Sequence, residues 1–468
     1  MSWMKAASRR HKWCLIFIAV WIFFFTAGES VAHGLSIEDE TKMGQQFLIQ
    51  MKSIFQFVDD DFANAYINDL GQYLVGFLET KPFNFHFYLI RSNDLNAFAG
   101  PGGHIFIFTG LIDVMDDVDE LAAVIAHEMG HVSARHISER LEQNTKFQLA
   151  TLAAILASAL IGGQAQGAIM TGSMAAMMQK QLAYSRDDER QADQLGFKYM
   201  SMAGFNPAGM IKTLKKIQRE EMVASDHVPA YLLTHPGGPE RMANYETMME
   251  GDKQLLHETA ATTKYRESFP IFKAILRAKY TDPTDAERAF NRDLAADPDA
   301  VWAHFGLGIV FREKEEYSKA VDQFHEALKR RPHSLVIIKN LAEAYQLMGR
   351  EDEAMPLFSE VLKQDPNDRS ALYLMALSYQ NLGEYEKSIP IFQKLTSMAP
   401  VKNDVYYNLG MSYGKLNQLA LAHYNFGIYF KREGKIGKAQ FHFQKAEEYA
   451  RNDPALQERI IKAKQGSL

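Results

Sequence analysis

The sequence predicts a mostly helical α+β chain in which a small β-sheet is confined to the first half. Apolar residues recur at helical spacing over most of the 468 residues, whereas the aromatic, alternating pattern typical of strands is limited to residues 83–90 and 104–108. In the second half, prolines recur at an interval of 34 residues, which indicates a stacked helical repeat. These prolines are Pro298, Pro332, Pro366 and Pro400.

Composition excludes several classes of protein. The chain has a net charge of −6 and 47% apolar residues, which allows real cores and argues against nucleic acid as a main partner and against a polybasic membrane patch. The single cysteine, Cys14, lies in an N-terminal apolar stretch. A disulfide framework and a cysteine-ligated metal site are therefore excluded.

Residues 1–32 are predicted to be a secretory signal peptide. Basic residues precede an apolar core from Trp13 to Thr26, and Ser30-Val31-Ala32 offers the small side chains of a cleavage site. A transmembrane anchor usually needs about 20 apolar residues, more than this core has. We therefore expect cleavage and export to the periplasm, with retention of the stretch as an inner-membrane anchor as the alternative.

A metal-binding motif occupies residues 127–131, His-Glu-Met-Gly-His. His127 and His131 are four residues apart on a predicted helix, so both imidazoles can bind one metal ion, with Glu128 beside the water site. Zinc, one ion per chain, is the metal expected for two histidines and a carboxylate. The helix is predicted to run from Val118 to about residue 143, which takes His136 off the metal-facing stripe. His136 is therefore not expected to be a ligand.

A third ligand is expected from a helix that begins after Ser185. Glu189 and Asp193 are four residues apart, so both carboxylates face one way. Glu189 would bind zinc directly, and Asp193 would accept the outer N–H of a ligand histidine, fixing its tautomer. On charge alone, a solvated acidic face is an equal alternative.

Together these motifs resemble a known family. His-Glu-x-x-His, followed about 55 residues later by Ser-Arg-x-x-Glu-x-x-Ala-Asp, is similar to the zinc metallopeptidases that include the CAAX prenyl endopeptidases and the heat-shock membrane protease. Asn96–Ala99 and Thr234–Pro236 also match that family's pattern. The resemblance covers residues 36–258 and implies a gluzincin-type zinc protease domain.

The resemblance also implies roles for individual residues. His127, His131 and Glu189 would be the zinc ligands, Glu128 the general base, and Asp193 a second catalytic carboxylate sometimes described as a proton donor. His235 could reach the open zinc position and hold the enzyme latent until substrate displaces it. Stabilisation of a transition-state oxyanion or simple loop packing are the alternatives for His235.

A strand predicted at residues 104–108 precedes the metal helix. Gly102 and Gly103 leave an edge uncluttered, so Gly103, His104 and Ile105 could pair with an extended peptide and present it across the metal. An ordinary core hairpin is an equal alternative. His104 is a poor ligand candidate, because a lone strand histidine is more often structural.

Residues 147–178 are almost wholly apolar and methionine-rich, interrupted near Gly162-Gly163. Neither piece reaches the length that a bilayer requires. A buried helical hairpin is one interpretation. A mobile cover over the active site, or a peripheral membrane contact, is the other.

Residues 267–468 are predicted to be an α-solenoid of tetratricopeptide repeats, because the interval of 34 residues is that repeat's signature. We expect about four repeats, a degenerate first unit and a capping helix from Lys438 to Arg451. Such an array binds peptides or protein surfaces on its concave side and has no chemistry of its own. Candidate lining residues are Asn340, Tyr373 and Asn408.

The order of signal, protease and repeats resembles exported quality-control members of the same family in Gram-negative bacteria. It implies a zinc metalloendopeptidase that degrades stalled or misassembled outer-membrane proteins and assists their assembly. The repeats would engage the outer-membrane barrel-assembly machinery or its client barrel proteins. The alternative is a chaperone or adaptor whose proteolysis is weak or latent.

Overall fold

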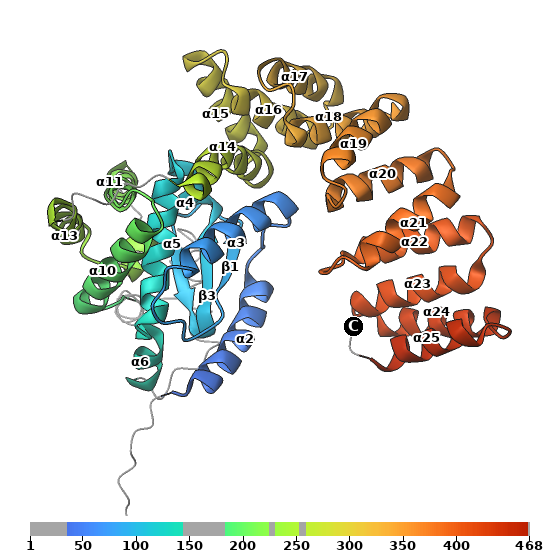
Figure 1. The fold of residues 1–468 in the computed structure, drawn as a ribbon, viewed down its shortest axis with the longest axis horizontal. Coiled ribbons are helices and arrows are strands. Elements are labelled where there is room, and N and C mark those ends of the chain that lie inside the picture. Colours follow the sequence, from blue (N-terminus) through green and yellow to red (C-terminus); the bar gives the residue numbers. More distant parts are fainter. Residues whose placement is uncertain (1–34, 144–182, 224–229, 252–258, 467–468) are drawn as a thin grey trace, which may run out of the picture. The chain divides into compact units, whose positions relative to one another are not determined.

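The computed structural model describes residues 35–143, 183–223, 230–251 and 259–466. It divides into two compact units. Unit 1 comprises residues up to Val58 and Ile67–Tyr265, and unit 2 comprises Asp59–Tyr66 and Arg266–Leu468. Figure 1 colours most of unit 1 blue to green and most of unit 2 yellow to red. The predicted signal peptide and the apolar stretch at 147–178 lie outside the described residues.

A three-stranded sheet lies in unit 1. Its strands are β1 (His86–Ile90), β2 (Ala97–Gly100) and β3 (His104–Phe108), in the order β1-β3-β2. β1 is parallel to β3, and β2 is antiparallel to it. Phe106 of β3 and Phe47 of helix α2 pack edge to face with ring centroids 5.9 Å apart, which joins the sheet to the core.

The prediction that Gly103, His104 and Ile105 form an exposed edge is wrong. His104 pairs with His86 on one side and Gly100 on the other, and Ile105 pairs with Phe87 and Ala99. Gly103 lies in the 3-10 turn η1 (Pro101–Gly103) that joins β2 to β3. Both backbone edges of β3 are therefore used within the sheet. Among the described residues, β1 and β2 are the outer strands.

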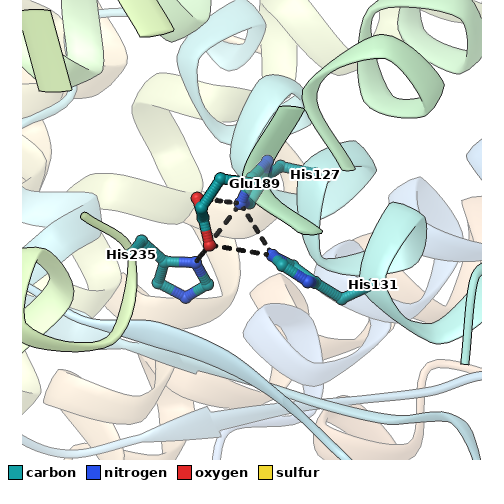
Figure 2. A group of neighbouring side chains, drawn as sticks. All are labelled: His127, His131, Glu189 and His235. Atoms are coloured by element: carbon teal, nitrogen blue, oxygen red, sulfur yellow. Dashed lines mark hydrogen bonds and ion pairs between the residues drawn. The ribbon is translucent and has the colours of Figure 1, made fainter. Parts of the chain in front are cut away.

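Most of unit 1 is helical. The helices are α2 (Ile37–Ile54), α4 (Thr109–Val114), α5 (Val118–Ser133), α6 (His136–Gln143), α10 (Arg186–Met202), α11 (Ala208–Val223), α12 (Ala230–Thr234) and α13 (Gly238–Gly251). Almost every residue of α5 is buried, and α5 and α10 lie side by side (Figure 1). These two helices carry His127, His131 and Glu189 toward one another (Figure 2).

The metal helix does not continue to residue 143 as predicted. It ends at Ser133, Ala134 caps it, and Arg135 adopts a φ of 59° before α6 begins at His136. A left-handed residue reverses the path of the chain, so residues beyond it leave the helical register. His136 is therefore placed by the turn between the helices and not by helical spacing.

Unit 2 is a series of helix pairs, which confirms the predicted helical array. Helix α3 (Asp61–Val75) begins in unit 2, and α14 (Ala260–Tyr280) ends in it. The remaining helices are α15 (Pro283–Ala296), α16 (Val301–Glu313), α17 (Tyr317–Arg330), α18 (Leu335–Leu347), α19 (Glu351–Gln364), α20 (Arg369–Asn381), α21 (Tyr385–Thr396), α22 (Asn403–Lys415), α23 (Leu419–Arg432), α24 (Ile436–Tyr449) and α25 (Pro454–Gln465). None of the helices in the described ranges is long and apolar enough to cross a membrane.

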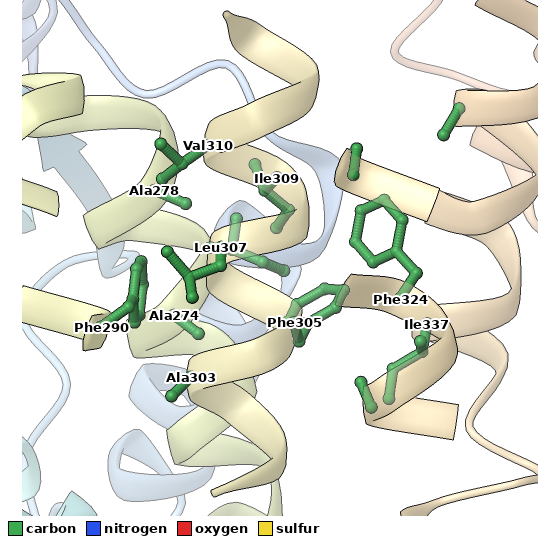
Figure 3. Close-up of a cluster of buried hydrophobic side chains, with 14 of the residues drawn as sticks. Ala274, Ala278, Phe290, Ala303, Phe305, Leu307, Ile309, Val310, Phe324 and Ile337 are labelled. Atoms are coloured by element: carbon green, nitrogen blue, oxygen red, sulfur yellow. The ribbon is translucent and has the colours of Figure 1, made fainter. Parts of the chain in front are cut away.

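The same phenylalanine builds the core of successive repeats. Phe290, Phe324, Phe358 and Phe392 recur at intervals of 34 residues, and each is almost fully buried. Figure 3 shows Phe290 and Phe324 on either side of α16, which contributes Phe305 and Leu307 to the same apolar cluster. The expected capping helix corresponds to α24, but α25 follows it as a further helix.

Candidate metal centre

Helices α5 and α10 come into close contact at two glycines. A Cβ atom on Gly130 would lie 2.7 Å from the carbonyl oxygen of Ala192, a distance that real Cβ atoms essentially never show. A Cβ atom on Gly196 would lie 3.0 Å from the backbone nitrogen of His127. Larger residues would force the helices apart, so these glycines determine how closely the side chains of α10 approach those of α5.

Local sequence also determines where α10 begins. The Ser185 side chain accepts a hydrogen bond from the backbone N–H of Asp188, and the Asp188 carboxylate accepts one from the backbone N–H of Ser185. This reciprocal capping box stabilises the first turn. Glu189 and Asp193 then lie one helical turn apart on the face that meets α5, as the sequence predicted.

Four side chains converge between these helices. His127 and His131 come from α5, Glu189 from α10 and His235 from the residue after α12 (Figure 2). All four are buried, and their candidate ligand atoms lie within 4.8 Å of one another. The Nε2 atoms of His127 and His131 are 3.1 Å apart. Glu189 Oε2 is 3.4 Å from the first of these atoms, and Glu189 Oε1 is 3.3 Å from the second.

The cluster fits a divalent metal ion. A tetrahedral zinc ion bound at about 2.0–2.1 Å would hold its ligand atoms about 3.4 Å apart, close to the spacing of His127, His131 and Glu189. The donors are imidazole nitrogens and a carboxylate oxygen, a set found in catalytic zinc sites. Both carboxylate oxygens of Glu128, and Nε2 of His235, are buried without a hydrogen-bond partner. Such orphaned groups are costly unless they have a ligand to bind.

Outer contacts set the tautomers of the two histidines on α5. The Asp193 carboxylate lies 2.8 Å from His127 Nδ1, so this nitrogen carries the proton and Nε2 is left as the ligand atom. On His131, Nδ1 lies 2.9 Å from Nδ1 of His136, whose Nε2 lies 2.9 Å from Gln191 Oε1. If His136 donates to Gln191, it accepts from His131, and His131 Nε2 is likewise free for a metal.

Arg241 of α13 joins the two carboxylates of α10. Its Nε and Nη2 donate to the two oxygens of Asp193 at 2.8 and 2.7 Å, and its Nη1 lies 3.0 Å from Glu189 Oε2. All three side chains are almost fully buried. A two-pronged guanidinium fixes the orientation of a carboxylate as well as its charge. Asp193 is therefore held against His127, and Glu189 beside it.

Comparison with known proteins assigns this part of the chain to a family. Residues 62–249 match the model of Peptidase family M48. They are an M48 peptidase domain. Residues 273–334 match the tetratricopeptide repeat, and residues 311–424 match the N-terminal TPR repeats region of Psidin.

Curated relatives of this M48 domain include the beta-barrel assembly-enhancing protease of Yersinia pestis. That protein is 31% identical over 241 residues, which are 51% of this chain and 49% of the relative. The protease of the same name from Escherichia coli K12 is 32% identical over 220 residues, 46% of this chain and 45% of the relative. The chain thus spans about half the length of the curated relatives it matches.

Solved structures similar to this chain include YrrB, a TPR protein. It is 21% identical and covers 46% of this chain and 97% of YrrB, with a TM-score of 0.28. A score this low supports no detailed comparison of the two structures.

The charges of the M48 domain act on its histidines in opposite directions. Burial drives the pKa of His131 well below its ordinary value, against the pull of the Glu189 carboxylate. Burial and the positive charge of Arg241 also lower the pKa of His127, but hydrogen bonds and charge from Asp193 and Glu189 outweigh them and raise it to about 9. Binding of a metal at His127 would therefore release a proton.

The carboxylates of α10 remain ionised despite their burial. Burial alone would raise the pKa of Glu189, but the neighbouring charges of His235 and Arg241 hold it well below its ordinary value. For Asp193, the charge of Arg241 and the hydrogen bond with His127 likewise outweigh burial and lower the pKa. Glu189 is therefore in the anionic form that a metal ligand requires.

His235 lies between the metal ligands and Glu128. Its Nδ1 is 2.9 Å from Glu189 Oε1, and its Nε2 is 3.4 Å from Glu128 Oε1. The ring stacks on Tyr231 of α12 with centroids 4.5 Å apart. The structure thus brings His235 to the cluster, whereas His104 of β3 is not part of it.

Sequence reasoning missed two contacts of this site. His136 was set aside because helical spacing was applied through residue 135, where the chain in fact turns. Arg241 was noticed only as part of a family pattern, although a basic residue predicted to be buried near two acids is a signal in itself. Neither contact follows from local spacing, because each depends on how α5, α6, α10 and α13 pack.

Proposed function

We propose that this chain is a zinc metalloendopeptidase, with His127, His131 and Glu189 as zinc ligands and Glu128 as the general base. The observation that carries the proposal is the buried cluster of two imidazoles and a carboxylate in an M48 domain, with Glu128 beside it. The unpartnered oxygens of Glu128 support its role, because a general base needs an acceptor directed at the reacting water.

Each residue has a distinct part in the proposed hydrolysis of a peptide bond. Zinc, when bound, would polarise the scissile carbonyl and acidify the attacking water. Glu128 would take the proton from that water and deliver it to the leaving amine. Both oxygens of Asp193 are engaged by Arg241, and one of them also by His127. This favours an orienting role for Asp193 over proton donation.

His235 is proposed to hold the enzyme in a latent state. Its contacts with Glu189 and Glu128 lie where a substrate carbonyl would have to enter. Replacing His235 with alanine should therefore raise proteolysis, measured as the initial rate of casein cleavage, while zinc content stays at one per chain. A rate at or below the wild-type rate would remove the latency idea and leave oxyanion stabilisation or loop packing.

We further propose an exported, periplasmic protein with a protease domain at about residues 36–258 and a binding array at about 267–468. The relatives named beta-barrel assembly-enhancing protease support clients among outer-membrane barrel proteins and their assembly machinery. The repeat matches support binding of peptides or protein surfaces by the array. Mass spectrometry of the protein isolated from its host tests export, because cleavage after Ala32 would leave His33 as the N-terminus.

The experiment that tests the peptidase is a comparison of the wild-type chain with Glu128→Gln. We expect casein cleavage to fall by about 10²–10⁴-fold, with zinc content, measured by inductively coupled plasma mass spectrometry, unchanged. Glu246→Gln, at an exposed position of α13, is the matched control and should cleave at the wild-type rate. Equal cleavage by wild type and Glu128→Gln would refute the assignment of the base.

A chaperone or adaptor role is the second candidate, favoured by the length of the repeat array relative to the M48 domain. The same Glu128→Gln variant separates the two in cells. If it restores outer-membrane barrel assembly to a deletion strain as well as wild type does, binding and not proteolysis is the main activity. Loss of every effect supports the peptidase.

A further inference from the structure

Unit 2 contains a groove whose lining is unusually rich in cations. A cavity of about 330 Å³ is lined by the first helices of three successive pairs, α18, α20 and α22, and by α14. Four basic side chains reach it, and they come from positions far apart in the sequence. They are Lys279, Lys339, Arg369 and Lys402.

An acidic segment of the chain itself, Asp59-Asp60-Asp61, lies in this groove. Lys279 Nζ binds Asp60 Oδ2 at 2.7 Å. Lys402 Nζ lies 3.4 Å from Asp61 and 3.6 Å from Asp59. The groove therefore already holds a short run of carboxylates, which acts as a built-in example of the ligand chemistry it accepts.

The three aspartates are held to very different degrees. The Asp60 side chain is 10% exposed, and its other oxygen accepts the backbone N–H of Ala63 at the start of α3. Burial would raise the pKa of Asp60, but the charge and hydrogen bond of Lys279 hold it below its ordinary value. Asp59 and Asp61 are 88% and 44% exposed, and their contacts with Lys402 are long. Asp60 is fixed, whereas its two neighbours are exchangeable.

The groove has more positive charge than this segment uses. Lys339 pairs with Asp368 at 2.7 Å, and the Arg369 guanidinium donates to the carbonyl oxygen of Pro400, a neutral group. Of the other acids that line the groove, Glu343 is paired with Arg312 from the neighbouring helix pair. A carboxylate that reached Arg369 could bind it in the two-pronged geometry that guanidinium prefers.

We propose that this groove binds an acidic segment of a partner protein, and that Asp59–Asp61 is an internal competitor for the same cations. The proposal rests on the binding role proposed above for the repeat array and is independent of proteolysis. An incoming run of Asp or Glu would displace Asp59 and Asp61 from Lys402 and add contacts to Arg369. Phe62 and Val336 in the lining would receive an apolar residue beside the acids.

Peptide binding to the full-length Glu128→Gln chain tests this proposal without cleavage of the probe. The probe is a fluorescein-labelled peptide of residues 56–64, and fluorescence anisotropy reports its binding. A second peptide with three asparagines in place of the aspartates serves as the comparison. We expect the acidic peptide to bind, with an affinity that falls as salt rises, and the asparagine peptide to bind at least 5-fold more weakly.

Variants of the chain separate the cations from the competitor. Lys402→Gln should weaken binding of the acidic peptide about 5-fold, whereas Lys387→Gln, an exposed lysine paired with Glu384 outside the groove, should leave it unchanged. The double variant Asp59→Asn and Asp61→Asn should bind the same peptide about 2- to 5-fold more tightly, because the competitor is weakened. Thermal unfolding of each variant checks that unit 2 remains folded.

Two outcomes would overturn the proposal. Equal affinity for the acidic and asparagine peptides would show that the groove does not select carboxylates. Equal binding by wild type and the double aspartate variant would show that the segment is a structural cap and not a competitor. A peptidase that fails to cut casein would leave these measurements untouched, so the two failures are distinguishable.

Discussion

The metal cluster of unit 1 and the cationic groove of unit 2 both bring opposite charges together, but in opposite surroundings. Arg241, Glu189 and Asp193 are at most 3% exposed, whereas Lys402 and Asp59 of the groove are 47% and 88% exposed. Buried charges must be paired, because desolvation costs several kcal/mol per ion, while exposed pairs contribute about 0–1 kcal/mol. The first arrangement holds one fixed geometry for chemistry, and the second can exchange its partners.

The largest effect that follows from this comparison is expected at Arg241. Arg241→Met removes the guanidinium and leaves Glu189 and Asp193 buried without their cation. We expect a loss of about 3–5 kcal/mol in the free energy of unfolding of unit 1, measured by urea denaturation in the presence of a chelator. Added zinc should restore part of this loss, because the metal supplies positive charge to Glu189.

Arg369→Met is the matched control in the groove. It removes a guanidinium that contacts only a carbonyl oxygen among the described residues. Its effect on unfolding should stay below about 1 kcal/mol. If the two variants cost the same, burial is not what distinguishes the two regions.

The next effect concerns the backbone contact beneath the metal cluster. Gly130→Ala should destabilise unit 1 by about 1–3 kcal/mol, because its Cβ would lie 2.7 Å from the Ala192 carbonyl oxygen. Gly414→Ala in α22 is the counterpart in unit 2, where the nearest atom is the Ala422 Cβ at 3.8 Å. That change should stabilise the helix by about 0.5–1 kcal/mol. Thermal unfolding measures both, and two changes of the same sign would contradict the proposed close contact.

The two regions also differ in how much the sequence could predict. In unit 2 one interval places each core residue, so the positions of Phe324 and Phe358 could be predicted from Phe290 alone. The fold class was confirmed for that reason. The helix α25 was missed because Gly434 stands where the earlier repeats have proline, which made the array look finished there.

In unit 1 the predictable part is confined to single helices. His127 with His131, and Glu189 with Asp193, share a face because each pair lies one turn apart. The central position of β3 was not predicted, because β2 lies in a glycine- and proline-rich segment that reads as a turn. The contacts of His136 and Arg241 were also not predicted, since they join segments that only tertiary packing brings together.

A smaller effect is expected from the contact that orients His131. His136→Ala removes the acceptor at His131 Nδ1 without touching the metal ligands themselves. We expect zinc affinity to fall about 10- to 100-fold, measured by competition with a fluorescent chelator. His304→Ala, in a partly buried contact with Gln323 of unit 2, is the control and should leave zinc affinity unchanged. An unchanged affinity in His136→Ala would mean that His131 is oriented by its stacking on Tyr184 instead.

The smallest effect is expected at Asp60, the one buried charge of the groove. Asp60→Asn keeps a side chain that can cap α3 but removes the charge that pairs with Lys279. We expect a loss of about 1–2 kcal/mol in the free energy of unfolding of unit 2 at pH 7. Because the pKa of Asp60 is lowered from 3.8 in the folded chain, its contribution is fully present above that value and is lost as pH falls through the folded pKa.

Urea unfolding of wild type and Asp60→Asn at pH 7, 5 and 3.5 measures this dependence. The difference between the two chains should be the same at pH 7 and 5 and should begin to shrink only below about pH 4. A difference that stays constant to pH 3.5 and below would mean that the cap to Ala63, and not the charge on Lys279, holds Asp60. In that case Asp60 would resemble the fixed charges of the metal cluster less than its burial implies, and the groove would be an exchangeable surface throughout.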